Sequence, residues 1–106
     1  MKKYAFIIWG KPYNYDPTKD VHSFTTEHQT TTVVTVTGFE EAVDKARELV
    51  AEGYGALELC GAFGKEKAAE LSAAIQGKAS VGYVYYEPEE KQKVEEYFRD
   101  FGKPSQ

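Results

Sequence analysis

The stretch from Thr30 to Cys60, TTTVVTVTGFEEAVDKARELVAEGYGALELC, decides the fold. Its first eight residues are all threonine or valine, which are β-branched and favour a strand. Apolar residues then recur at helical spacing from Phe39 to Val50, and Gly53 is expected to end that helix. The closing segment, ALELC, is a short apolar run typical of a second strand. Strand, helix and strand in this order predict a parallel β-α-β unit.

The same alternation continues on both sides of this unit. The apolar run YAFIIW at residues 4–9 predicts a strand buried on both faces. A helix over about residues 65–76 and a strand at 81–86 are expected to follow, and Pro88 suits the first turn of a third helix. The predicted fold is α/β: a small open sandwich with a four-stranded, mostly parallel sheet and three helices, in the order β-loop-β-α-β-α-β-α. A ferredoxin-like arrangement needs a further hairpin between helices, which the sequence does not show.

Length and composition limit the classes of protein. With 106 residues and 11.9 kDa, the chain is expected to be one domain spanning residues 1–106. An aromatic content of 14% argues against a disordered chain. A net charge of -4 and a pI near 5.2 argue against a nucleic-acid partner. The sequence contains no apolar run of the ~20 residues that span a membrane. One cysteine forms no internal disulfide, so we expect a cytoplasmic protein.

Residues 10–29 carry no hydrophobic period and are rich in proline, aspartate and other turn formers. This predicts a long loop, and loops of this length often act as lids or binding loops. Tyr13 and Tyr15 within it suit closure over a ligand, because tyrosine offers a flat apolar face and a polar tip. His22 and His28 stand near acidic residues, but their spacing matches no tight zinc pattern, and no metal is expected.

The segment ELCGAFG at residues 58–64 carries the candidate chemistry. Strand alternation puts Glu58 and Cys60 on one face, with Cys60 at the carboxyl end, where open α/β sheets bind ligands. A carboxylate in a short strand of a parallel sheet is costly unless it is paired or functional. If the protein is an enzyme, Glu58 is the expected general acid or base and Cys60 the second participant. In the alternative, Glu58 pairs with a basic or tyrosine side chain and Cys60 packs in the core.

The remaining residues of this segment are the candidate anion site. Gly61, Ala62, Phe63 and Gly64 precede a helix, where backbone N–H groups favour a phosphate or carboxylate. The segment matches neither a Walker sequence nor the three-glycine dinucleotide pattern. The alternative is that its glycines only allow a sharp turn.

Aromatic residues end two of the predicted strands, Trp9 the first and Tyr86 the last. They suit a cleft for a planar ligand, so both are expected to contribute to binding. The leading hypothesis is a domain that binds a small anionic or planar metabolite at the carboxyl ends of the strands. The alternative is a non-catalytic protein that forms a homodimer or a larger assembly through its tyrosine-rich last strand. The sequence names no cofactor and leaves open whether the protein is an enzyme.

The elements YAFIIWG, TTTVVTV, ELCGAFG and VGYVYY together resemble a small prokaryotic family of proteins of about 100 residues, a domain of unknown function with an ELCGxFG motif. The resemblance extends over nearly the whole chain, from residue 3 to about residue 101. It implies no activity, cofactor or catalytic residue. It does imply that ELCGAFG acts as a unit, which suits a site or a demanding turn.

Overall fold

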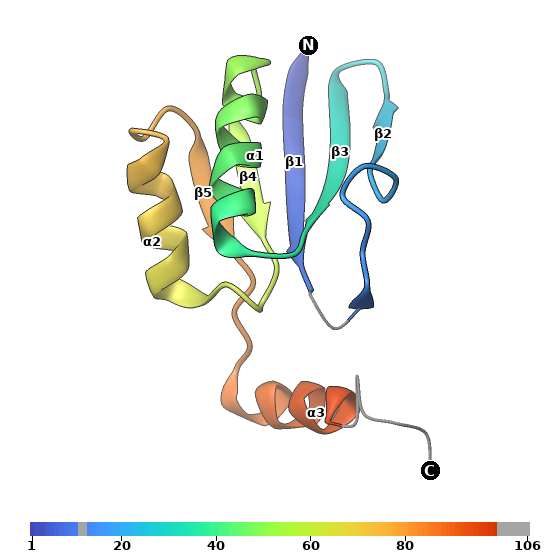
Figure 1. The fold of residues 1–106 in the computed structure, drawn as a ribbon, viewed down its shortest axis with the longest axis vertical. Helices are drawn as coiled ribbons and strands as arrows, with labels where there is room; N and C mark the ends of the chain where they lie inside the picture. The colour runs from blue at the N-terminus through green and yellow to red at the C-terminus, as the bar shows by residue number, and fades with distance from the viewer. Residues whose placement is uncertain (11–12, 100–106) are drawn as a thin grey trace.

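The computed structural model describes residues 1–10 and 13–99, which form one mixed sheet and three helices (Figure 1). The α/β class and the alternation of strands and helices are confirmed. The strands lie in the order β2-β3-β1-β4-β5, and only β2 runs antiparallel to its neighbour. The elements are β1 (Lys2–Trp9), β2 (His22–Thr25), β3 (Gln29–Val36), α1 (Phe39–Ala51), β4 (Ala56–Leu59), α2 (Gly64–Ala74), β5 (Ser80–Tyr83) and α3 (Pro88–Phe98).

The sheet has a fifth strand, so the prediction of four strands is wrong by one element. β2 lies inside residues 10–29, which the sequence predicts as a loop, and forms a hairpin with β3. All four of its residues are exposed, because an edge strand has one neighbour and needs no apolar pattern. Hydrogen bonds between hydroxyl groups join it to β3 in place of apolar contacts: Ser23 bonds Thr32 at 2.5 Å, and Thr25 bonds Thr30 at 3.0 Å. The hairpin precedes the first helix, so the fold is not ferredoxin-like.

Helices α1 and α2 contact each other and lie on the same side of the sheet (Figure 1). The step from β3 to β4 passes over β1, and the step from β4 to its neighbour β5 continues in the same direction across the sheet. Because such crossovers are right-handed, both connecting helices must cover the same face. The core lies between this face and the two helices, and its largest fully buried side chains are Ile7, Val36, Leu57, Leu59 and Leu71.

The opposite face of the sheet carries no helix in the part of the chain that the structure describes. In β1, Ala5 and Ile7 are fully buried, whereas the alternating residues Tyr4, Phe6 and Ile8 are partly exposed. The prediction that this strand is buried on both faces is therefore wrong. The reason is topological: the connection from β1 to β3 extends the sheet through β2 instead of crossing over this face.

We call this surface the open face. The strand register assigns its members, which are Lys2, Tyr4, Phe6, Ile8, His22, Phe24, Gln29, Thr31, Val33, Thr35, Ala56, Glu58, Ser80 and Gly82. Thr35 is covered by the loop before β2, where its hydroxyl donates a 3.0 Å hydrogen bond to the carbonyl oxygen of Asp20.

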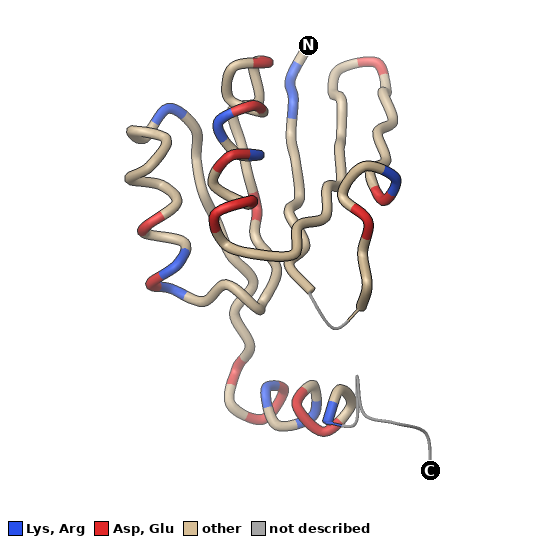
Figure 2. The backbone as a smooth tube through the Cα atoms, in the orientation of Figure 1, with Lys and Arg blue, Asp and Glu red and all other residues tan. Residues whose placement is uncertain are grey.

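Helix α3 lies beyond the carboxyl ends of the strands (Figure 1) and has no buried residue. Pro88 occupies its first turn, as predicted. The described chain is elongated, with extents of 47 × 29 × 28 Å. Figure 2 shows most charged residues on the helices and loops, while the strands carry few beyond the amino end of β1. None of the described helices is both long and apolar enough to cross a membrane.

Candidate functional site

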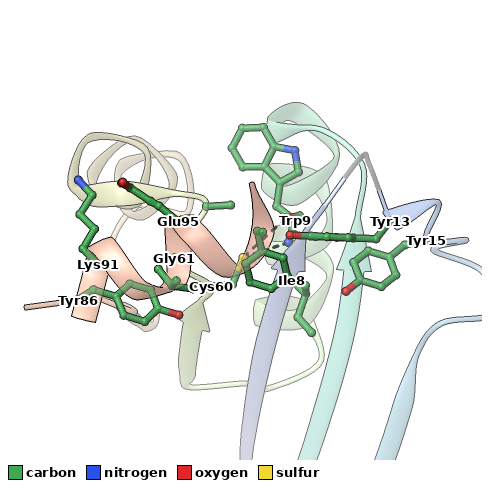
Figure 3. A pocket seen from close by; sticks show the side chains of 12 residues that line it. Ile8, Trp9, Tyr13, Tyr15, Cys60, Gly61, Tyr86, Lys91 and Glu95 are labelled. Atoms are coloured by element: carbon green, nitrogen blue, oxygen red, sulfur yellow. Dashed lines mark hydrogen bonds between the residues drawn. The ribbon is translucent and has the colours of Figure 1, made fainter. Parts of the chain in front are cut away.

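A cavity of about 680 Å³ lies where the carboxyl ends of β1 and β4 meet α3 (Figure 3). Five of its lining residues are aromatic: Trp9, Tyr13, Tyr15, Tyr86 and Phe98. Figure 3 shows Tyr13 and Tyr15 on one side and Tyr86 on the other, with Cys60 between them. The lining is completed by Ile8, Cys60, Gly61, Ala62, Lys91, Val94 and Glu95.

The segment after β1 forms one wall of the cavity. The rings of Tyr13 and Tyr15 are tilted with centroids 5.3 Å apart, and Tyr13 lies 6.0 Å from Phe98 of α3. Tyr13 packs so closely on Gly10 that a Cβ atom there would collide with its ring. Gly10, the residue after β1, therefore allows this wall to form.

Burial raises the pKa of Tyr15, and the negative charges of neighbouring groups, Tyr13 first and then Cys60 and Asp20, raise it further. The pKa of the Tyr15 phenol consequently lies above its ordinary value of 10.0. At neutral pH it presents a hydroxyl donor and not a phenolate.

Trp9 stands where the cavity meets the core. Its indole packs edge-on against Phe63, with ring centroids 5.1 Å apart, and tilted against Phe39 at 6.3 Å. Phe63 itself is 4% exposed and does not line the cavity, and neither does Gly64. These two residues, predicted to bind ligand, lie in the core and at the start of α2.

The two glycines of ELCGAFG have different structural reasons to be glycine, one steric and one conformational. A Cβ atom on Gly61 would lie 3.0 Å from Cε2 of Tyr86, so the absence of a side chain lets the Tyr86 ring approach the loop. Gly64 has a φ of +74°, a left-handed conformation that other residues rarely adopt. The N–H of Phe63 donates a 3.2 Å hydrogen bond to the carbonyl of Cys60 within the turn. That amide is occupied, and the anion-binding role of this loop stays a prediction.

Cys60 joins the ends of β1 and β4. Its Sγ accepts a hydrogen bond from the N–H of Trp9 at 3.3 Å and donates to the carbonyl oxygen of Trp9 at 3.8 Å. Neither histidine approaches it. His22 in β2 is three strand positions from β4, or about 14 Å at the usual spacing of ~4.8 Å. His28 lies in the turn between β2 and β3, at the amino end of β3.

Glu58 lies on the open face and does not line the cavity. The hydroxyl of Tyr4 donates a 2.9 Å hydrogen bond to its Oε2. Burial raises the pKa of Tyr4, and the hydrogen bond and the charge of Glu58 raise it further. Glu58 is thus paired with a tyrosine, as the alternative interpretation expects, and its role in catalysis stays a prediction.

Of the ten residues predicted for the site, the structure brings seven together around the cavity: Trp9, Tyr13, Tyr15, Cys60, Gly61, Ala62 and Tyr86. Sequence reasoning missed Ile8 and the contribution of α3. The signal for α3 was the apolar pair Val94 and Phe98, four residues apart within a stretch that otherwise looks like a solvated helix.

Two acidic residues in the loop before β2 have structural partners. The carboxylate of Asp16 accepts hydrogen bonds from the N–H and the hydroxyl of Thr18, at 2.9 and 2.6 Å, and these lower its pKa. Asp20 accepts a bond from the N–H of Asp16 at 2.7 Å. Among residues 1–10 and 13–99, no group of three or more His, Cys, Asp or Glu side chains is placed to hold a metal ion.

Fold and site together define a class: a small α/β domain with helices on one face of its sheet and an aromatic cavity at the carboxyl ends of its strands. The chain belongs to DUF6506, a family of unknown function, which matches residues 2–99. The expected membership in a family of unknown function is thereby confirmed. No curated protein and no solved structure matches the chain.

Proposed function

We propose that this protein binds a small, planar and largely apolar ligand in the cavity between the strand ends and α3. The observation that carries the proposal is the set of five aromatic side chains around a volume of about 680 Å³. Ligand pockets typically enclose ~300–1,000 Å³ and are lined by apolar and aromatic groups with a few polar ones. The position, at the carboxyl ends of parallel strands, is the usual place for ligands in such sheets.

The polar groups of the cavity suggest how the ligand is oriented. Lys91 on α3 supplies a cation suited to a carboxylate or phosphate substituent. Tyr15 adds a neutral hydroxyl donor, since a phenol is protonated at neutral pH and burial raises the pKa of Tyr15 further. The anionic group expected from the sequence is therefore proposed to meet Lys91 instead of the amides of the ELCGAFG turn.

Binding is proposed in preference to catalysis for two reasons. Glu58, the expected acid or base, lies outside the cavity and is hydrogen-bonded to Tyr4. Cys60 lines the cavity, but its thiol is engaged with the backbone of Trp9. A cytoplasmic location, which suits a chain with one cysteine, is part of the same proposal.

A thermal-unfolding screen tests the proposal. The panel comprises flavins, purine nucleotides and aromatic carboxylic acids as planar ligands, with sugar phosphates and aliphatic acids as non-planar ones. A ligand at 100 times its Kd stabilises the folded state by ~2.7 kcal/mol, which raises the Tm of a domain this size by roughly 10 °C. Each hit is then titrated by following the fluorescence of Trp9, the only tryptophan of the chain.

Two neighbouring tyrosines provide matched variants. Tyr86 lines the cavity, whereas Tyr85 is 68% exposed and does not. Tyr86→Ala is expected to weaken binding about tenfold or more, because it removes an aromatic face. Tyr85→Ala should leave the Kd unchanged. A panel without a planar hit, or equal losses in both variants, would contradict the proposal.

A further inference from the structure

We infer that the open face is the interface of a homodimer, in which two copies of this chain pack sheet against sheet. The inference uses the sheet and not the cavity, so it does not depend on the proposed ligand. It rests on the topology of the sheet, the composition of the open face, and the area that a stable dimer requires.

The topology leaves a parallel sheet half covered. Four of the five strands, β3, β1, β4 and β5, run parallel to one another. Parallel sheets occur almost only with both faces covered, because their strands are apolar on both sides. Here α1 and α2 cover one face, whereas in the described chain no helix or strand covers the other, where the loop before β2 covers only the position of Thr35. A partner that is always present in stoichiometric amount would supply the missing layer, and a second copy meets that condition.

The composition of the open face suits contact with itself. Its centre is apolar, with Phe6 of β1 beside Val33 of β3, and with Tyr4 and Ile8 in the adjoining rows. Phe24 on the edge strand is 61% exposed. A two-fold axis places the same surface on both sides, so an excess of one charge would oppose association. Although the chain carries a net charge of -4, Glu58 and Lys2 balance each other on this face.

The area of the face is close to what a stable dimer needs. Five strands at ~4.8 Å spacing span about 20 Å, and strands of four to eight residues rise about 13–26 Å. Before side-chain relief the face then offers roughly 400 Å² per copy, or about 800 Å² for the two copies together, against the ~1,000 Å² in total at which specific interfaces begin.

Molar mass across a concentration series tests the inference, measured by light scattering and sedimentation equilibrium on the full chain. The wild type is expected at about twice its chain mass of 11.9 kDa at micromolar concentration. Thr31→Arg places a charge on the open face at a partly exposed polar position, where the folded monomer tolerates it. This variant should weaken association at least 100-fold and give the mass of one chain.

Two further variants make the test specific. Phe6→Arg changes the centre of the face and should also give a monomer, with far-UV circular dichroism to confirm folding. Ala69→Arg adds the same charge at an exposed position of α2, on the covered side of the sheet, and should remain dimeric. A wild type that stays monomeric at several hundred micromolar overturns the inference. So does a dimer that survives both open-face changes, or one that Ala69→Arg disrupts equally.

Discussion

At the scale of single residues, glycines decide how the ELCGAFG turn is formed. Gly64 begins α2 with a φ of +74°, and nothing lies within 4 Å of where its Cβ would stand. Its requirement is therefore conformational and not steric. Gly61 is the reverse case, since a Cβ there would press on the ring of Tyr86. One turn thus contains two glycines kept for different physical reasons.

Gly64→Ala should lower the free energy of unfolding by about 1 kcal/mol, because an L side chain is strained in the left-handed region. Urea unfolding followed by circular dichroism measures the change. Gly55→Ala is the matched control: its Cβ would also meet nothing within 4 Å, and its φ lies outside the left-handed region. Equal losses in the two variants would show that φ is not what requires glycine at the start of α2.

The Tyr4–Glu58 pair predicts how stability changes at alkaline pH. Burial and Glu58 raise the pKa of Tyr4 above its ordinary value of 10.0 in the folded state. The unfolded chain therefore loses this proton first as the pH rises. The contribution of Tyr4 to stability is complete below about pH 10 and is lost as the pH rises through its folded-state pKa.

The wild type should lose more stability than Tyr4→Phe between about pH 9 and pH 11, since phenylalanine has no proton to release. Urea midpoints at the two pH values give the comparison. Tyr15 carries a shift in the same direction and is present in both proteins, so the difference between them isolates Tyr4. Equal losses of stability in the wild type and the variant would show that the Tyr4–Glu58 contact does not affect the pH dependence of stability.

At the scale of elements, three hydroxyl groups hold the edge strand β2 to the rest of the molecule. Thr32 of β3 is 4% exposed and bonds both Ser23 of β2, at 2.5 Å, and the hydroxyl of Tyr54, at 2.6 Å. Tyr54, 8% exposed, lies between α1 and β4. This chain of hydroxyls connects the hairpin to the covered side of the sheet.

Thr32→Val should lower the free energy of unfolding by about 1–3 kcal/mol, because it leaves the buried hydroxyl of Tyr54 without this partner at nearly unchanged volume. Thr25→Val, at the exposed Thr25–Thr30 pair, serves as the control and should change stability by less than ~0.5 kcal/mol. Chemical denaturation of the two variants measures both values. A Thr32→Val protein as stable as the control would mean that the hydroxyl chain contributes nothing.

The sequence predicts the elements that carry a strong period and misses those held by other forces. β1, β3 and α1 follow from apolar runs, β-branched residues and helical spacing. β2 does not, because hydroxyl pairs and a hairpin turn hold it in place of an apolar pattern. The sequence also does not predict that one side of β1 belongs to the open face, since apolar residues such as Phe6 and Ile8 give the same pattern whether or not a layer covers them.

The candidate site was predictable as far as strand ends determine it. The carboxyl ends of parallel strands meet at one edge, which brings Trp9 of β1 and Cys60 after β4 together. Tyr86 also lines the cavity, but the last strand, predicted at residues 81–86, ends at Tyr83, so Tyr86 belongs to the segment between β5 and α3. Alternation also placed Glu58 beside Cys60, but the cavity lies beyond the end of β4, so a shared face did not bring the carboxylate into it. The wall of the cavity that α3 forms depends on the path of the short segment after β5. The hydrophobic pattern of the sequence does not predict that path.

At the scale of the whole molecule, α3 contributes to the cavity and little to the core. It has no buried residue, whereas the core cluster lies among the sheet, α1 and α2. A chain that ends at Tyr86 should therefore unfold cooperatively with a Tm within a few degrees of the wild type. It should no longer bind any ligand of the cavity, because Lys91, Val94 and Phe98 are removed.

Calorimetry and fluorescence titration of this shortened chain measure the two effects separately. Pro88→Gly, which keeps the helix residues and disturbs only its first turn, provides an intermediate comparison. Loss of the cooperative transition on truncation would show that α3 stabilises the sheet after all, and full retention of binding would place the ligand elsewhere.

The central position of β1 has a consequence for biosynthesis. β1 is made first, yet its two neighbours in the sheet, β3 and β4, end only at residues 36 and 59. At ~5–20 residues per second, the ribosome needs several seconds to supply both partners. During that time the uncharged segment YAFIIW has no strand to pair with, and such segments are prone to aggregate. The nascent chain is therefore at its most vulnerable before residues 40–60 emerge, and molecular chaperones that bind apolar segments have a target in β1 during that time.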